Sequence, residues 1–245
     1  MEEISLKSEV VFQIHGFPIT NSLIAAWLAM IILILLAVLI RLSVKKIPGR
    51  LQTIFEIISL VLLSLMEEIY QDRKIARQVF PWANTLFLFI LFSNWIGILP
   101  GFGSFGKYED SHFVPFLRPA NADINNPLAL AILSVLLAQV FGIFAAGFFR
   151  YLKRFFNLRN PITFFVGILE FFSEMIKVVS FSFRLFGNIF AGEVLLLVIS
   201  SLVPLFAPLP FYMLEIFVGF IQALVFTMLT IVFIRLALLV AEEEH

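Results

Sequence analysis

The feature that most constrains this chain is a series of long apolar runs, separated by short charged segments or by segments rich in Gly and Pro. A run of about 20 apolar residues is the length an α-helix needs to cross the roughly 30 Å hydrocarbon core of a membrane. Charged residues make up only 14% of the chain, against about 25% in a soluble domain. The sequence therefore predicts an all-α polytopic membrane protein and excludes a soluble globular fold.

The apolar runs divide a single integral membrane domain, residues 1–245, into helices and connections. Residues 51–70 are apolar but carry three glutamates, which favours a helix at the membrane interface over a spanning helix. Residues 100–126 are rich in Gly, Pro, Asn and Asp, which is typical of a long loop. We expect an external N-terminus over 1–21, membrane-crossing helices over 22–40, 80–99, 127–149, 161–202 and 211–240, and an interfacial helix over 51–70.

The orientation follows from the basic residues between the helices, because cytoplasmic loops carry an excess of Lys and Arg. Segments 41–50, 71–79 and 150–160 together hold 11 basic residues, whereas the N-terminus and the 100–126 segment together hold 3. The two sets alternate along the chain as five crossings require. We therefore expect the N-terminus outside and the C-terminus in the cytoplasm.

Several kinds of chemistry are not indicated by the sequence. The chain has no cysteine, and its three histidines have no metal-ligand spacing, so we predict no metal site and no cofactor. No phosphate-binding loop, nucleophile elbow or catalytic triad occurs, which argues against an enzyme acting alone. The net charge is zero, and nothing points to a nucleic-acid partner.

The last two apolar runs are too long for upright membrane helices. Some 40 residues over 161–202 make a helix of about 60 Å, twice the thickness of the hydrocarbon core. The run over 211–240 is also long, and a Pro-rich turn joins the two. Their apolar composition argues against protrusion into water. We therefore predict that they form a hairpin of two steeply tilted helices.

Charged residues inside these two helices are the strongest functional signal. Inserting a charged side chain at the membrane centre costs about 2.5–3.5 kcal/mol even on the insertion scales that give the lowest values. At about 100° per residue, one helix face holds five polar residues within about 40° of its arginine: Glu170, Lys177, Ser180, Arg184 and Asn188. Glu193, nine positions after Arg184, points about 180° away. On the last helix, Glu215 and Gln222 share a face.

The position of each charge suggests its role. Glu170, Glu174 and Lys177 lie near the expected cytoplasmic end of their helix, where structural ion pairs or snorkelling groups are the favoured interpretation. Arg184 lies deep in its helix with no acidic residue on its own face within two turns. Because an arginine cannot lose its proton in a protein, it cannot relay one. It can attract a carboxylate from a partner surface, so the chain looks like one half of a proton path.

Three segments resemble subunit a of the F-type ATP synthase, the stator channel that faces the rotating c-ring. They are SFRLFGNIFAGE (182–193), VGFIQALVFTMLTIVFI (218–234) and PFLRPANADINNPLALAIL (115–133). The resemblance covers about residues 48–245. It implies a proton-conducting subunit of a bacterial-type inner membrane that is not itself catalytic. Its implied partners are the c-ring, peripheral-stalk b subunits and membrane lipid, with two offset half-channels reaching the ring.

The resemblance also implies roles for individual residues. Arg184 matches the family's essential arginine, with Asn188 and Ser180 beside it. Glu193 matches the acidic residue nine positions later, and Gln222 the glutamine of the last helix. Glu215 stands where some relatives have histidine and many have glutamate, so the resemblance implies an outer path with two carboxylates. Glu170 and Lys177 match polar positions of the long helix.

Two other interpretations deserve comparison. A stand-alone secondary transporter would bind a solute at a charged site near the midplane, but it predicts an inverted repeat and broken helices, and the sequence has neither. A structural scaffold leaves Arg184 without a reason to be there. The sequence does not decide between H⁺ and Na⁺ as the transported ion.

Overall fold

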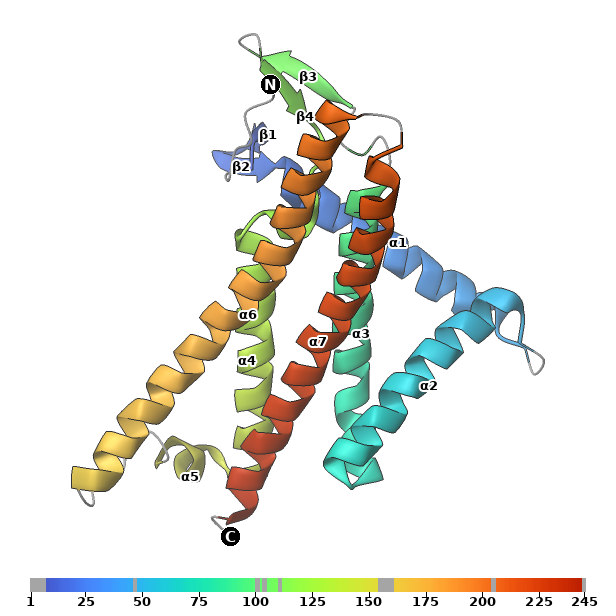
Figure 1. Cartoon of the computed structure of the whole chain (residues 1–245). Helices are drawn as coiled ribbons and strands as arrows, with labels where there is room; N and C mark the ends of the chain where they lie inside the picture. The colour runs from blue at the N-terminus through green and yellow to red at the C-terminus, as the bar shows by residue number, and fades with distance from the viewer. Residues whose placement is uncertain are drawn as a thin grey trace.

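The structure is a computed structural model that describes residues 8–45, 48–99, 102, 105–109, 112–153, 161–203 and 206–243. Within these residues the chain forms seven α-helices, two β-hairpins and one short 3₁₀ helix (Figure 1). The α-helices are α1 (Asn21–Ser43), α2 (Arg50–Tyr70), α3 (Arg73–Ile98), α4 (Asn125–Ala146), α5 (Phe148–Lys153), α6 (Pro161–Leu202) and α7 (Pro208–Glu243). The remaining elements are β1 (Val10–Ile14), β2 (Phe17–Thr20), β3 (Gly106–Glu109), β4 (His112–Pro115) and the 3₁₀ helix η1 (Ala120–Ala122).

Five of the helices, α1, α3, α4, α6 and α7, are long and apolar enough to cross a membrane. This confirms the prediction of an all-α polytopic membrane protein. The two longest are α6, with 42 residues, and α7, with 36. They run antiparallel to one another, and Figure 1 shows both lying obliquely to α4.

The hairpins lie at one end of the helix bundle, which we call the hairpin end; α5 and the C-terminal end of α7 lie at the opposite end (Figure 1). Hairpin β1–β2 turns through His15 and Gly16, which both have positive φ, of 49° and 83°, as a tight two-residue hairpin turn requires. Thr20, which ends β2, caps α1 by accepting a hydrogen bond from the backbone of Leu23. The hairpin therefore leads directly into the first long helix.

Three boundaries differ from the sequence-based prediction. Helix α3 begins at Arg73 and not near residue 80, because Asp72 caps its first turn by accepting from the Lys74 backbone. Residues 106–109 and 112–115 form the two strands of hairpin β3–β4 within the segment predicted as a loop. Helix α4 ends at Ala146 because Gly147 adopts a φ of 85°, a conformation that only glycine adopts readily.

Helix α7 is at the centre of the packing, since it contacts α2, α3, α4 and α6. Its buried core side chains include Phe226, Ile231 and Ile234, and Tyr70 of α2 donates a hydrogen bond to the Ile231 carbonyl at 3.0 Å. Helix α6 is far less enclosed. In its most apolar window 11% of residues are buried, against 44% for α3. A broad face of α6 is therefore left uncovered by this chain.

Candidate functional site

Helices α6 and α7 pack against each other in antiparallel orientation, so residues later in α6 contact residues earlier in α7. We call this line of contacts the seam. Near the C-terminal end of α7, the Lys177 ammonium lies 4.5 Å from the centre of the Phe233 ring. One turn further along α6, the Phe181 ring packs on Phe233 at 5.3 Å and on Phe226 at 4.8 Å between ring centres. These aromatic contacts fix the register of the seam, and polar residues follow toward the hairpin end.

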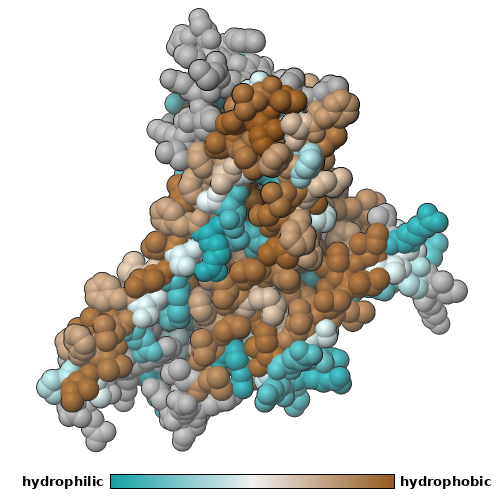
Figure 2. All heavy atoms as spheres, in the orientation of Figure 1, coloured by the Kyte–Doolittle hydropathy of each residue, from teal (hydrophilic) through white to brown (hydrophobic). Residues whose placement is uncertain are grey.

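Arg184 lies on the uncovered side of α6, where its side chain is exposed. Its Nη2 donates a 3.4 Å hydrogen bond to the Ser180 hydroxyl, and its Cζ lies 6.0 Å from the centre of the Phe181 ring. Among the described residues, Arg184 has no carboxylate within ion-pair distance. Figure 2 shows hydrophilic residues gathered at mid-height between α6 and α7, with hydrophobic surface on both sides.

Asn188 and Gln222 link the two helices directly. The Asn188 Nδ2 donates to the Gln222 Oε1 at 2.7 Å. Gln222 is 4% exposed, and its Nε2 is buried with no hydrogen-bond partner among the described residues. A buried amide donor of this kind calls for water or a further polar group. The pair therefore forms a polar point in the seam, one turn from Arg184.

Glu193 pairs with Arg118, a partner that sequence reasoning missed. The Arg118 Nε and Nη2 atoms donate to both Glu193 carboxylate oxygens at 3.0–3.3 Å. Arg118 is 9% exposed, and its Cζ lies 6.0 Å from the centre of the Phe190 ring. By sequence alone, Arg118 is one of the few basic residues of the N-terminus and the 100–126 segment. A lone arginine beside the polar stretch PANADINN was the available signal.

Glu215 lies against the backbone of α6 at Gly192. A Cβ atom added at residue 192 would overlap the Glu215 carboxyl group, with Cδ at 2.8 Å. Glu215 is 9% exposed, and its Oε2 is buried without a hydrogen-bond partner among the described residues. Gly192 therefore makes room for this carboxyl group beside Glu193. By contrast, a Cβ at Gly187 would meet nothing within 4 Å.

A buried polar network at the hairpin end holds Arg118 in place. The 3₁₀ helix η1, which follows Arg118, is buried, and Asn121 donates to the Asn94 Oδ1 at 2.7 Å. Asn94 in turn donates to the Gly219 carbonyl of α7 at 3.0 Å. Because this network joins η1 to α3 and α7, it fixes the backbone that carries Arg118 over α6.

Asp123 ties the same segment to α1. Its carboxylate accepts a 2.8 Å hydrogen bond from Ser22 and bonds from both the backbone and the side chain of Asn125. Burial alone would raise the pKa of the Asp123 carboxyl, but hydrogen bonds from Ser8, Asn125 and Ser22 outweigh burial and lower the pKa below its usual value.

The five polar residues that share a face by helical geometry do not act as one connected stripe. Ser180 and Arg184 are hydrogen-bonded, but Lys177 pairs with Glu174 at 2.7 Å and turns toward α7. Asn188 bonds across the seam to α7. Glu170 is half-buried, one helical turn before Glu174. Lys177 thus has the structural ion pair that was one of its two interpretations.

The sequence of this chain is similar to those of known proteins. A sequence-family model described as ATP synthase A chain matches residues 23–235. The ATP synthase subunit a of Moorella thermoacetica is 32% identical over 91% of this chain and 93% of the relative. The ATP synthase subunit a of Campylobacter jejuni is 33% identical over 100% of both chains. The Propionigenium modestum protein named ATP synthase subunit a, sodium ion specific, is 32% identical over 96% of this chain and 80% of the relative.

The family match begins inside α1 and ends inside α7, so it spans all five membrane-crossing helices and every residue of the site. We conclude that the chain is an integral membrane protein that belongs to the ATP synthase subunit a family.

Proposed function

We propose that this chain is the proton-conducting stator subunit of a rotary F-type ATP synthase, and that the uncovered face of α6 lies against the c-ring. The observation that carries the proposal is the exposure of Arg184 in the middle of a membrane-crossing helix. A guanidinium facing lipid is costly and stays charged. A carboxylate on a partner subunit would supply the missing counter-charge.

In this proposal, protons approach the ring from the hairpin end, past Glu193 and Glu215. The buried Oε2 of Glu215 and Nε2 of Gln222, which have no partners among the described residues, support a hydrated path there. Ser180 and Asn188 flank Arg184 on the ring-facing side, within one helical turn. A ring carboxylate takes up a proton and becomes neutral, which lets it turn through lipid.

The second half-channel would open at the opposite end of the bundle, near Glu170 and Lys177. There the ring carboxylate releases its proton and then meets Arg184. Because Arg184 keeps its charge throughout, it attracts the ionised carboxylate and repels a proton moving directly between the half-channels. The hairpin end would face outside, with the C-terminus in the cytoplasm, in a bacterial-type inner membrane.

Arg118 adds a fixed positive charge to the outer path. It binds both oxygens of Glu193, which leaves the Glu215 carboxyl as the acidic group without a charged partner among the described residues. Nucleotide chemistry would belong to other subunits of the complex, and b subunits of the peripheral stalk would hold this chain still against the turning ring.

Cysteine cross-linking in membranes that hold the complex tests the facial assignment, because the chain has no natural cysteine. Single cysteines at Ser180, Arg184 and Asn188 should cross-link to cysteines in the outer helices of the ring. The matched control is Ser182→Cys, since Ser182 is 1% exposed and faces the interior of the bundle. Cross-linking from residue 182 with none from residue 180 would refute the proposed ring-facing surface.

The transported ion needs a separate measurement, because one relative of comparable identity is named as sodium ion specific. We propose H⁺ for this chain. ATP-driven acidification of inverted vesicles should then proceed at the same rate in nominally sodium-free buffer and in added NaCl. Pumping that requires Na⁺, and that generates no pH gradient, would instead support Na⁺ as the transported ion.

A further inference from the structure

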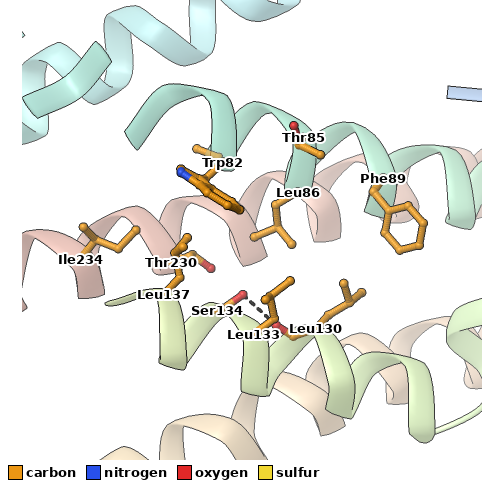
Figure 3. Close-up of a pocket in the computed structure, with 11 residues that line it drawn as sticks. Trp82, Thr85, Leu86, Phe89, Leu130, Leu133, Ser134, Leu137, Thr230 and Ile234 are labelled. Carbon is orange, nitrogen blue, oxygen red and sulfur yellow. Dashed lines mark hydrogen bonds between the residues drawn. The ribbon is translucent and has the colours of Figure 1, made fainter. Parts of the chain in front are cut away.

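A pocket of about 170 Å³ lies between α3 and α4, with α7 forming its floor (Figure 3). On its rim, Trp82 and Leu133 expose 54% and 53% of their surface, whereas Leu86 and Ile234 at its base are buried. The pocket therefore opens sideways between two membrane-crossing helices. Of the three helices that line it, α3 and α4 carry no residue of the proposed proton path.

The hydroxyl groups in the pocket wall already donate hydrogen bonds within their own helices. The Ser134 hydroxyl donates to the Leu130 carbonyl at 2.9 Å, as Figure 3 shows. The Thr230 hydroxyl donates to the Phe226 carbonyl at 2.9 Å, and the Thr85 hydroxyl to the Pro81 carbonyl at 2.7 Å. A bound water needs two to four polar partners. The Trp82 indole N–H is a donor, but it lies on the exposed rim, and the three hydroxyl donors of the wall are occupied, so an apolar guest fits best.

The size and position of the pocket narrow the choice of guest. An apolar cavity of about 150 Å³ in a soluble protein stays dry and holds a molecule the size of benzene. A helix, about 10 Å across, is too wide to enter, and only one of its side chains could. Since the mouth opens between membrane-crossing helices, the apolar group present at high concentration beside it is a lipid chain.

We propose that this pocket binds one acyl chain of an anionic phospholipid, with the headgroup near Lys74. Lys74 is exposed and lies 11 positions before Thr85, about 20° away around the helix axis and beyond the Trp82 end of the pocket. Within the described residues the Lys74 ammonium is in no ion pair. An exposed Trp at the mouth is typical of the boundary between hydrocarbon and headgroups.

Photolabelling tests the site in membranes that hold the intact complex, using phosphatidylglycerol or phosphatidylcholine with a diazirine on the acyl chain. Label on peptides of the pocket rim is divided by label on α1, whose exposed side chains include Ile34 and Leu35. We expect this ratio to be about four for phosphatidylcholine, the preference that burial of one extra methylene gives. For phosphatidylglycerol the charge of Lys74 adds about fivefold, which raises the ratio to about 20. Equal labelling of rim and α1 would overturn the proposal.

Two matched pairs of variants separate the chain site from the headgroup site. Leu133→Trp should close the mouth of the pocket and abolish the excess labelling. The matched control is Leu136→Trp, which should leave the labelling unchanged, because Leu136 is also exposed (55%) but lies outside the pocket. Lys74→Gln should lower phosphatidylglycerol labelling about fivefold, to the phosphatidylcholine level. Arg73→Gln, which removes a charge that faces Glu67 of α2, should leave it unchanged.

The other outcomes contradict the proposal. If Leu133→Trp and Leu136→Trp label alike, no chain enters the pocket. If both charge variants behave alike, the headgroup does not lie at Lys74. If the rim takes no lipid label and cross-links to another subunit instead, a partner helix covers the pocket.

Discussion

Replacing Arg118 by methionine removes the guanidinium that binds Glu193 and leaves that carboxylate without its partner. Arg118 and Glu193 expose 10% and 25% of their side chains. Losing one partner of a fully buried pair costs about 3–5 kcal/mol, and an exposed pair contributes less than about 1 kcal/mol. The partial burial therefore predicts a loss of about 2 kcal/mol in the free energy of unfolding.

The assay is a double-mutant cycle on the full chain in detergent micelles, with the unfolding free energy taken from denaturant titration. Arg118→Met alone should lose about 2 kcal/mol, and adding Glu193→Gln should restore about half of that loss because the unpaired charge disappears. Arg118→Lys keeps the charge but not the two-pronged hydrogen bonding, so it should fall between wild type and Arg118→Met. Strictly additive losses would refute the coupling between Arg118 and Glu193.

Three further predictions address neighbouring residues. Gly192→Ala should slow proton flux about tenfold or more, because its Cβ would displace the Glu215 carboxyl group. Gly187→Ala is the control and should leave proton flux unchanged, and similar flux in the two variants would contradict the packing argument. Glu193→Gln and Glu215→Gln should each slow flux and be less than additive together if they share one path; additive effects would indicate separate roles. Asp123 has a lowered pKa in the folded chain, so its stabilisation is complete above the unfolded pKa of about 3.9 and is lost as pH falls through the folded value. Asp123→Asn should remove that acid-dependent loss, and an unchanged pH profile of unfolding would count against it.

The long helices were predictable because their signals are local. Helix α6 runs over Pro161–Leu202, the range that uninterrupted apolarity indicates, with Pro161 at its start. The start of α3 was predicted too late, because the basic stretch after Asp72 reads as a loop by hydropathy. The capping hydrogen bond that Asp72 accepts from the Lys74 backbone, and helix-forming residues such as Ala76, outweigh that signal.

The site was only partly predictable from the sequence. Arg184, Glu193, Glu215 and Gln222 stand out because each is polar in an apolar helix. Ser180, the partner of Arg184, lies four positions earlier on the same helix. The partners of the other three depend on tertiary contacts that no spacing rule encodes. Arg118 reaches Glu193 across 75 positions of the sequence, from a segment with no helical period.

The hairpins were missed for a different reason. They contain few residues, and hairpin β3–β4 is flanked by Gly and Pro, which masks the alternation typical of strands. The sequence indicates the close approach of Gly192 to Glu215 only in general terms, because small residues permit helices to pack closely.

The most direct test of the central claim is ATP-driven proton pumping by complexes that carry Arg184→Gln or Arg184→Lys, in inverted vesicles with matched amounts of assembled complex. Both variants should insert and assemble, because removing or shortening one exposed side chain of α6 leaves the buried core of the bundle unchanged. Pumping should be abolished in the glutamine variant, which lacks the fixed counter-charge for the ring carboxylate. It should also fail in the lysine variant, whose charge is compact and can be lost on burial. Pumping near the wild-type rate in Arg184→Gln, at equal assembly, would contradict the account.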